Sequence, residues 1–150
     1  MQNIEPKCSA VSRNAPVHVV AAVIYNNVDS QQILIAKRPK HVHQGGLWEF
    51  PGGKVSDGET PSQALCRELL EELDISIINH KPLMQVFHDY PDKQVFLDIW
   101  SVTSFSGVAR GAEGQECRWV TIADLLVENT GYQFPEANRA ILKKLSSMAG

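Results

Sequence analysis

Three glutamates, Glu68, Glu71 and Glu72, are spaced so that their carboxylates can act together. At about 100° of rotation per residue, positions i, i+3 and i+4 share one face of a helix. Like charges at these spacings repel each other, and residues 56–75 hold six acids against one base, Arg67. Carboxylate oxygens gathered in this way are the ligands that Mg²⁺ or Mn²⁺ requires. The face is therefore a candidate metal site, and the alternative is a solvated polar stripe.

A helix over residues 60–73 is expected to carry these glutamates. Thr60 is a favourable N-cap, Pro61 suits the first helical position, and Gln63 completes a T-x-x-Q capping box. The broadly opposite side of the helix is apolar, which predicts a packing face there. The residues of that predicted face are Leu65, Cys66, Leu69, Leu70 and Leu73.

The other elements are expected to alternate between strands and helices. Apolar, β-branched runs predict strands over 17–25, 32–38, 83–90, 94–105 and 118–120, with a short extended piece at 47–51. Pro91 and Asp92 predict a hairpin turn. Further helices are expected over 122–128 and 135–147. Strands interleaved with helices indicate an α/β fold with a mixed sheet. The polar segment 1–15 is expected to be a flexible tail before a single domain over 16–150.

Composition excludes several classes of protein. The chain has 150 residues, of which 43% are hydrophobic and 21% charged, with a net charge of −3. The acidic balance argues against stable nucleic-acid binding. No apolar run approaches the roughly 18 residues of a membrane span, so no membrane partner is expected. The N-terminal residues lack the apolar stretch of a secretory signal. Three widely spaced cysteines fit a reducing compartment, so we expect a cytoplasmic protein, and a monomer.

The segment from Gly53 to Ile75 resembles the Nudix box. It reads G-x5-E-x7-R-E-L-L-E-E-L-D-I, and the box reads G-x5-E-x7-R-E-U-x-E-E-x-G-U, where U is apolar. Asp74 departs from the pattern, because the family has a glycine there, which suits a left-handed helix C-cap that Asp tolerates at some cost. The runs G-L-W-E-F-P-G-G-K at 46–54, E-G-Q-E at 113–116 and F-P-E-A-N at 134–138 resemble the MutT-type branch. The likeness covers about residues 17–145.

The resemblance implies a Nudix-type α/β/α sandwich, with a mixed β-sheet between helices. It also implies Mg²⁺-dependent hydrolysis (Mn²⁺ is the other candidate) of 8-oxo-dGTP to 8-oxo-dGMP and pyrophosphate, by water attack at the β-phosphorus. This activity sanitises the nucleotide pool. A metal would neutralise the phosphate oxygens and lower the pKa of a bound water. The implied metal ligands are the Gly52 carbonyl and the side chains of Glu68, Glu71, Glu72 and Glu113. The general base is Glu68 or Glu113, and the sequence leaves both open.

Other residues are expected to support this chemistry. Arg67 and Glu59 are expected to pair and brace the junction between loop and helix, since an arginine can hold a carboxylate through two hydrogen bonds. For the nucleobase, the resemblance points to Asn138, which offers a donor and an acceptor to a purine edge. The remaining candidates are Arg38 and Phe50 for the nucleobase pocket, and Lys37, Arg38 or Lys93 for the polyphosphate. The plain alternative for Gly52 and Gly53 is a tight turn with positive φ.

Two further functions stay open. The run G-L-W-E-F also occurs in Nudix enzymes that act on pyrimidine nucleotides, such as CTP or an oxidised cytidine nucleotide, whereas Asn138 favours a purine. The third hypothesis is a catalytically silent Nudix-fold module that binds a nucleotide or a partner protein. The complete set of glutamates in the box opposes this third hypothesis.

Overall fold

The structure, a computed structural model, describes residues 16–41, 45–127 and 131–149. The predicted tail over 1–15 lies outside these ranges. The elements in chain order are β1 (Val17–Ile24), β2 (Gln32–Lys37), β3 (Trp48–Glu49), β4 (Gly52–Lys54), α2 (Pro61–Leu73), β5 (Ser76–Asp89), β6 (Gln94–Ser106), β7 (Cys117–Thr121), α3 (Ile122–Leu126), η1 (Glu136–Asn138) and α4 (Arg139–Ala149). No helix within the described ranges has the length and apolarity needed to cross a membrane.

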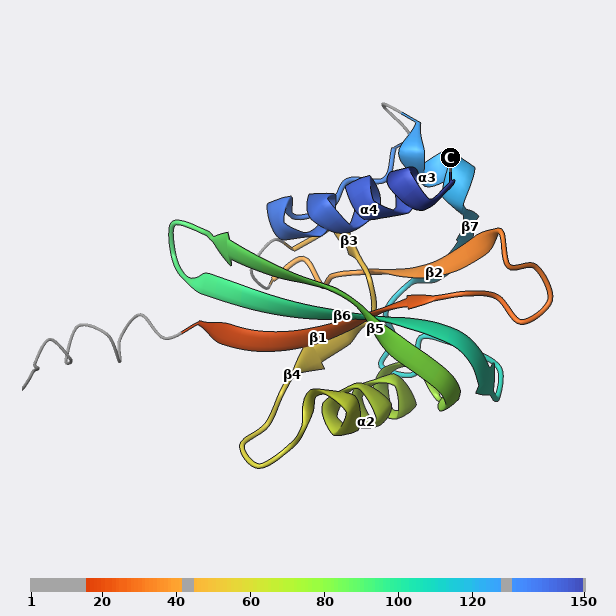
Figure 1. The fold of residues 1–150 in the computed structure, drawn as a ribbon, viewed down its shortest axis with the longest axis horizontal. Coiled ribbons are helices and arrows are strands. Elements are labelled where there is room, and N and C mark those ends of the chain that lie inside the picture. Colours follow the sequence, from red (N-terminus) through yellow and green to blue (C-terminus); the bar gives the residue numbers. More distant parts are fainter. Residues whose placement is uncertain (1–15, 42–44, 128–130, 150) are drawn as a thin grey trace, which may run out of the picture.

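Two sheets lie between the helices. The mixed sheet has the order β4–β1–β6–β5, with β1 and β6 parallel and the other pairs antiparallel. Figure 1 shows α2 on one side of the strands and α3 with α4 on the other. The predicted α/β sandwich with a mixed sheet is confirmed, and the structure adds an antiparallel sheet in the order β3–β2–β7. The second sheet forms because β4 and β6 occupy both edges of β1, so β2 pairs with β7 instead.

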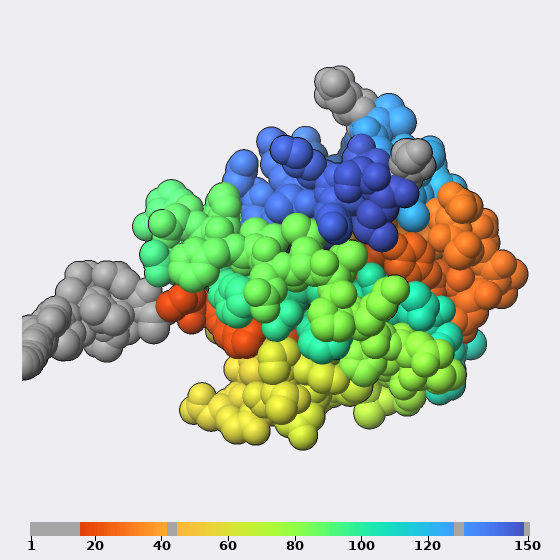
Figure 2. All heavy atoms as spheres, in the orientation of Figure 1, coloured from red at the N-terminus to blue at the C-terminus, as the bar shows by residue number. Residues whose placement is uncertain are grey.

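The side chains of β1 alternate between two apolar cores, because successive residues of a strand point to opposite faces. Val20, Ala22 and Ile24 pack toward α2, and Ala21 and Val23 pack toward α4. The helices complete the cores with Ala64, Leu65, Leu69 and Leu73 on the first side, and with Leu125, Ile141 and Leu145 on the second. In Figure 2 the atoms of β5 and β6 fill the band between α4 and α2.

Helix α2 begins and ends as the sequence predicts. The Thr60 hydroxyl accepts a hydrogen bond from the Gln63 backbone N–H at 3.1 Å, and the Gln63 side chain accepts one from the Thr60 N–H at 3.0 Å. At the other end, Asp74 takes the left-handed conformation with φ 60° and ψ 38°, and its N–H bonds back to the last turn. Asp therefore fills the cap position that the family gives to glycine.

The packing face of α2 is displaced from the predicted one, because Ala64 is fully buried together with the leucines. Leu65, Leu69 and Leu73 are fully buried, as positions i, i+4 and i+8 on one line of the helix. Cys66 and Leu70 are exposed, so their assignment to the packing face was wrong. They lie on the side of the helix opposite Ala64. Ala64 and Glu68 are four residues apart on the same side, so the displaced face brings Glu68 against β4.

Strand β5 starts at Ser76, seven residues before the predicted start. Its first half is mostly exposed, and its pairing with β6 shifts register at three points: Ile77/Asn79, Asn79/His80 and Pro82/Met84. Each shift inverts the side chains relative to the sheet, so the alternation that would reveal a strand is lost. The predicted hairpin at 91–92 is confirmed, since Tyr90 and Lys93 exchange backbone hydrogen bonds at 2.8 and 3.3 Å.

Candidate active site

A cavity of about 270 Å³, open to solvent, lies where β1, β4, the β5–β6 hairpin and η1 meet. It gathers residues that are far apart in the sequence. The predicted site residues that line it are Arg38, Phe50, Gly52, Glu72, Lys93 and Asn138. Lys37 is not part of this lining: its ammonium lies 5.7 Å from the centre of the Trp48 ring.

Glu72 lines this cavity, and its surroundings disfavour the charged form of its carboxyl. Burial raises its pKa, and the nearby carboxyls of Glu49, Glu68 and Glu113 raise it further, to about 9, against a hydrogen bond from the Gly52 backbone that lowers it. A carboxyl held away from water among other carboxyls ionises readily only when a cation compensates the charge. The surroundings of Glu72 therefore suit a bound cation.

Glu68 lies beside Glu72 and is pressed against β4. Only 16% of its side chain is exposed, and burial is the main reason that its pKa is raised. A Cβ added at Gly53 would overlap the Glu68 carboxyl group. Gly52 is tight as well, because a Cβ there would overlap the carbonyl of Val20. Neither glycine has a positive φ, so the alternative of a positive-φ turn was wrong, and close approach is what requires them.

Glu71 is the most exposed of the three glutamates and is not among the residues that line the cavity. Its side chain is 55% exposed and lies 3.2 Å from the Arg67 guanidinium. The three glutamates thus share one face, as predicted, but differ in burial: Glu68 and Glu72 are partly buried, and Glu71 is exposed.

Arg67 connects α2 to the loop before it. Its guanidinium donates to both carboxylate oxygens of Glu59, at 2.6 and 2.9 Å, and to the Lys54 carbonyl at 3.1 Å. The two bonds from Arg67 to Glu59, with one from the Ser56 backbone, hold the pKa of Glu59 at about 2. The structure contains the bidentate pair that the sequence predicts. A further bond of 3.0 Å to Glu68 extends the brace to the carboxylate that packs against Gly53.

Glu113 is brought to the cluster by the loop before β7. The Glu72 carbonyl accepts hydrogen bonds from the Ala112 backbone at 2.9 Å and from the Gln115 side chain at 3.0 Å. The Gln115 amide oxygen in turn accepts from the Glu113 N–H at 3.0 Å. The loop is therefore fastened to the end of α2, and Glu113 lies near enough to raise the pKa of both Glu68 and Glu72.

Glu49 is a site residue that the sequence reasoning missed. It lines the cavity and forms an ion pair of 2.6 Å with Arg38, yet burial still raises its pKa. The sequence signal that could have identified Glu49 is its position between the aromatic residues Trp48 and Phe50, which are buried. A carboxylate next to core residues is rarely left without a partner. The pair also holds Arg38 at the cavity, where the sequence analysis places it as a candidate.

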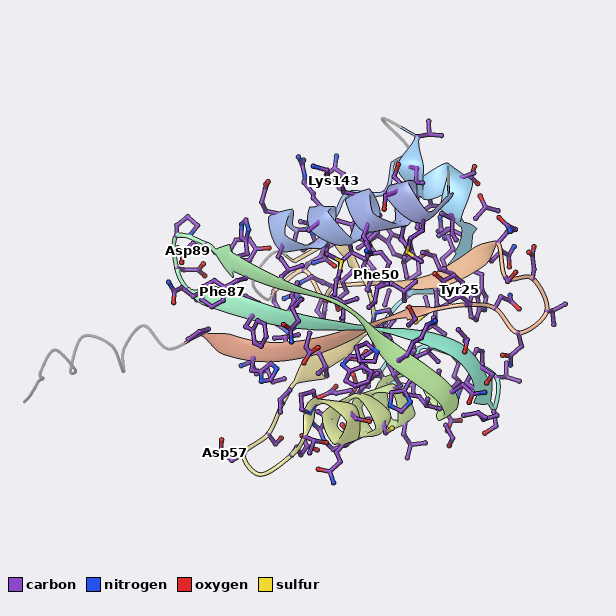
Figure 3. The ribbon with its side chains drawn as sticks, in the orientation of Figure 1. Tyr25, Phe50, Asp57, Phe87, Asp89 and Lys143 are labelled. Atoms are coloured by element: carbon purple, nitrogen blue, oxygen red, sulfur yellow. The ribbon has the colours of Figure 1, made fainter. Side chains whose placement is uncertain are left out.

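Phe50 forms the apolar floor of the cavity. It is 2% exposed and stacks against Phe134, with ring centres 5.4 Å apart and planes 26° from parallel. Figure 3 shows Phe50 between α4 and the sheets. An apolar wall beside polar groups suits a partly polar ligand.

The acidic residues fit a divalent cation, although they are not arranged as a closed site. In the part of the chain that the structure describes, no three His, Cys, Asp or Glu side chains are grouped as ready metal ligands. Arg67 instead forms ion pairs with the carboxylates of Glu68 and Glu71. Neighbouring carboxyls nevertheless raise the pKa of Glu68 and of Glu72. A set of hard oxygen donors lacking positive charge is what Mg²⁺ or Mn²⁺ prefers.

Comparison with known proteins identifies the family. A NUDIX domain model matches residues 20–144. The 8-oxo-dGTP diphosphatase of Proteus vulgaris is 44% identical over 105 residues, covering 68% of this chain and 88% of that protein. The CTP pyrophosphohydrolase of Escherichia coli (strain K12) is 36% identical over 110 residues, covering 73% and 79%. A structure from work on MutT of Aliivibrio salmonicida and Vibrio cholerae matches with a TM-score of 0.75 at 41% identity, covering 89% and 98%.

The chain therefore belongs to the Nudix family. Within it, the chain is a hydrolase of the MutT type. The predicted family, fold and enzyme class are confirmed by these matches.

Proposed function

We propose that this enzyme hydrolyses 8-oxo-dGTP to 8-oxo-dGMP and pyrophosphate with Mg²⁺, and so keeps oxidised purines out of DNA synthesis. The observation that carries the proposal is that one cavity is lined by both Glu72 and Asn138. A single ligand can therefore present its phosphates to the carboxylates and its base to the amide. The relative named 8-oxo-dGTP diphosphatase supports the same substrate. We further propose that the enzyme is a cytoplasmic monomer that forms no stable complex with nucleic acid.

The acidic cluster is proposed to act on the phosphates. The Gly52 carbonyl and Glu68, Glu71, Glu72 and Glu113 would hold Mg²⁺, or Mn²⁺ in its place. When bound, the cation supplies charge neutralisation at the phosphate oxygens and a water of lowered pKa. Glu68 or Glu113 accepts the proton of the attacking water at a carboxylate oxygen. The raised pKa of Glu68 supports this role, because a base works best when its pKa approaches the working pH.

The remaining residues are proposed to position the substrate. The pair of Arg67 and Glu59 holds the loop and α2 in a fixed relative position, so that the carboxylates stay next to β4. Phe50 forms part of the apolar wall beside the base, and Asn138 offers one donor and one acceptor to a purine edge. Arg38 and Lys93, which line the cavity, supply positive charge toward the nucleotide. Lys37 is left out of the proposal, since it packs over Trp48.

An assay of triphosphates in isotopically labelled water tests the function. With Mg²⁺, 8-oxo-dGTP should have the highest kcat/KM of a panel that also includes dGTP and CTP. The labelled oxygen should appear in pyrophosphate, because the proposed attack is at the β-phosphorus. Label in the nucleoside monophosphate would move the attack to the α-phosphorus. A panel in which 8-oxo-dGTP is not cleaved would overturn the proposal.

A pyrimidine nucleotide is the second candidate substrate, supported by the relative named CTP pyrophosphohydrolase. Asn138→Ala separates the two candidates. Losing a donor and an acceptor to the base should lower kcat/KM for 8-oxo-dGTP by about 10–100-fold and leave the rate with CTP near its original value. Asn79→Ala is the control, because Asn79 bonds Ser104 on an exposed strand pair. An Asn138→Ala enzyme that keeps its full preference for 8-oxo-dGTP would show that Asn138 does not select the purine, and would remove the support that this residue gives to the purine candidate.

A further inference from the structure

The short helix η1 lacks a cap of its own. It begins after Pro135, which makes no side-chain capping hydrogen bond. The first N–H groups of any helix have no acceptor within that helix. Ala137, in the middle of η1, is 3% exposed. Its N–H is therefore shielded from water and requires an acceptor from elsewhere in the fold.

Tyr90 supplies that acceptor from a distant part of the chain. Its hydroxyl oxygen accepts a hydrogen bond from the Ala137 N–H at 2.8 Å. Tyr90 follows the last residue of β5, in the tight hairpin that leads to β6. Figure 1 shows this hairpin beside the end of α4 that η1 precedes. The hydroxyl thus acts as a helix cap contributed by a different element.

This bond joins two walls of the cavity. Tyr90 and Lys93 line it from the hairpin, and Pro135, Ala137 and Asn138 line it from η1. Asn138 comes directly after the anchored residue, and its own N–H bonds the Pro135 carbonyl at 2.9 Å. Fixing the Ala137 peptide therefore fixes the direction in which the Asn138 side chain leaves the backbone.

We propose that the Tyr90 hydroxyl is a positioning residue for nucleobase recognition: by capping η1 it holds Asn138 in the orientation that binds the base. The proposal rests on the proposed function, in which Asn138 contacts the base. It predicts that the hydroxyl contributes to substrate binding and not to the chemical step, because the carboxylate cluster lies on other elements, α2 and the loop before β7.

Tyr90→Phe tests the proposal, because it removes the hydroxyl and keeps the ring that packs edge-on against His88. Without nucleotide, hydrogen exchange of the Ala137 amide should become about tenfold faster, as expected for a lost hydrogen bond. The KM for the nucleotide that the wild type cleaves best should rise about 3–10-fold, with kcat changed less than about twofold. Tyr132→Phe is the matched control, since its hydroxyl accepts from Arg118 at an exposed site outside the cavity lining. It should change neither value.

A double variant shows whether Tyr90 acts through Asn138. In an Asn138→Ala background, Tyr90→Phe should raise KM no further, because the group that it positions is gone. Independent effects on KM would mean that Tyr90 acts on the substrate directly, and would overturn the proposal. So would faster exchange at Ala137 with an unchanged KM, or unchanged exchange. Because exchange is measured without nucleotide, a wild type inactive on 8-oxo-dGTP would refute the proposed function and not the cap.

Discussion

Glu72→Gln should lower kcat by about 10²-fold or more while the protein stays folded, since a carboxylate that holds a catalytic cation has no amide equivalent. Glu72 lies in the cavity, and three other carboxyls raise its pKa. Glutamine keeps the shape and removes the negative charge that would bind the metal. Steady-state hydrolysis of saturating 8-oxo-dGTP with Mg²⁺ measures the loss. The control is Glu116→Gln, because Glu116 pairs with Arg118 at an exposed site and should leave kcat unchanged.

The same substitution should make the metal-free protein less sensitive to alkaline pH, although it lowers kcat. The pKa of Glu72 is about 9 in the fold and about 4.3 in an unfolded chain. Between these values the native state binds more protons than the unfolded state, so stability falls as the pH rises. Glutamine removes this loss. With a chelator present, the Tm of the wild type should fall more from pH 6 to pH 9 than the Tm of Glu72→Gln.

These two results separate function from folding. A variant with low kcat and a Tm at or above that of the wild type has lost a ligand and not its structure. A Glu72→Gln enzyme with kcat close to the wild type would show that the carboxylate cluster is not the reacting centre. Equal pH dependence of Tm in both proteins would show that Glu72 is not held among carboxyls in solution.

Local signals in the sequence were enough for most of the fold. The capping box at Thr60 and Gln63 depends on residues three apart, and it forms as predicted. The apolar run of β1 likewise predicts a buried strand, because alternate residues serve two cores. The start of β5 and the separate β3–β2–β7 sheet could not be predicted. Register shifts remove the alternation that would reveal the start of β5. The separate sheet depends on which strands occupy the two edges of β1.

The candidate site could likewise be predicted only in part. The spacing of Glu68, Glu71 and Glu72 places them on one face, and this needs only the geometry of a helix. How deeply each lies depends on β4, whose glycines allow Glu68 to pack closely. Glu49 could not be identified by spacing, because its importance comes from the ion pair with Arg38 across two strands. A contact between distant segments leaves no periodic trace in the sequence.

Gly53→Ala is expected to fold and to lose activity. Its Cβ would overlap the carboxyl of Glu68, which is the end of a flexible side chain. The side chain can move aside, so the Tm should change little. The carboxyl is then displaced from the cluster, and a misplacement of about 1 Å at a reacting centre can cost about 10²-fold in rate. Steady-state kinetics and thermal unfolding of the same preparation measure both effects.

Gly52→Ala provides the contrast, because the atoms that its Cβ would overlap belong to the backbone of β1 at Val20 and Ala21. Gly52 pairs with Ala21 in the sheet, so the overlap can be relieved only by separating β4 from β1. Overpacking of this kind costs about 1–3 kcal/mol or more, and Gly52→Ala should show a clearly lower Tm. If Gly53→Ala keeps the wild-type kcat, the contact between β4 and the Glu68 carboxyl does not align the site. Equal losses of Tm in the two variants would mean that the Glu68 side chain cannot move aside, and that it is held as firmly as the backbone.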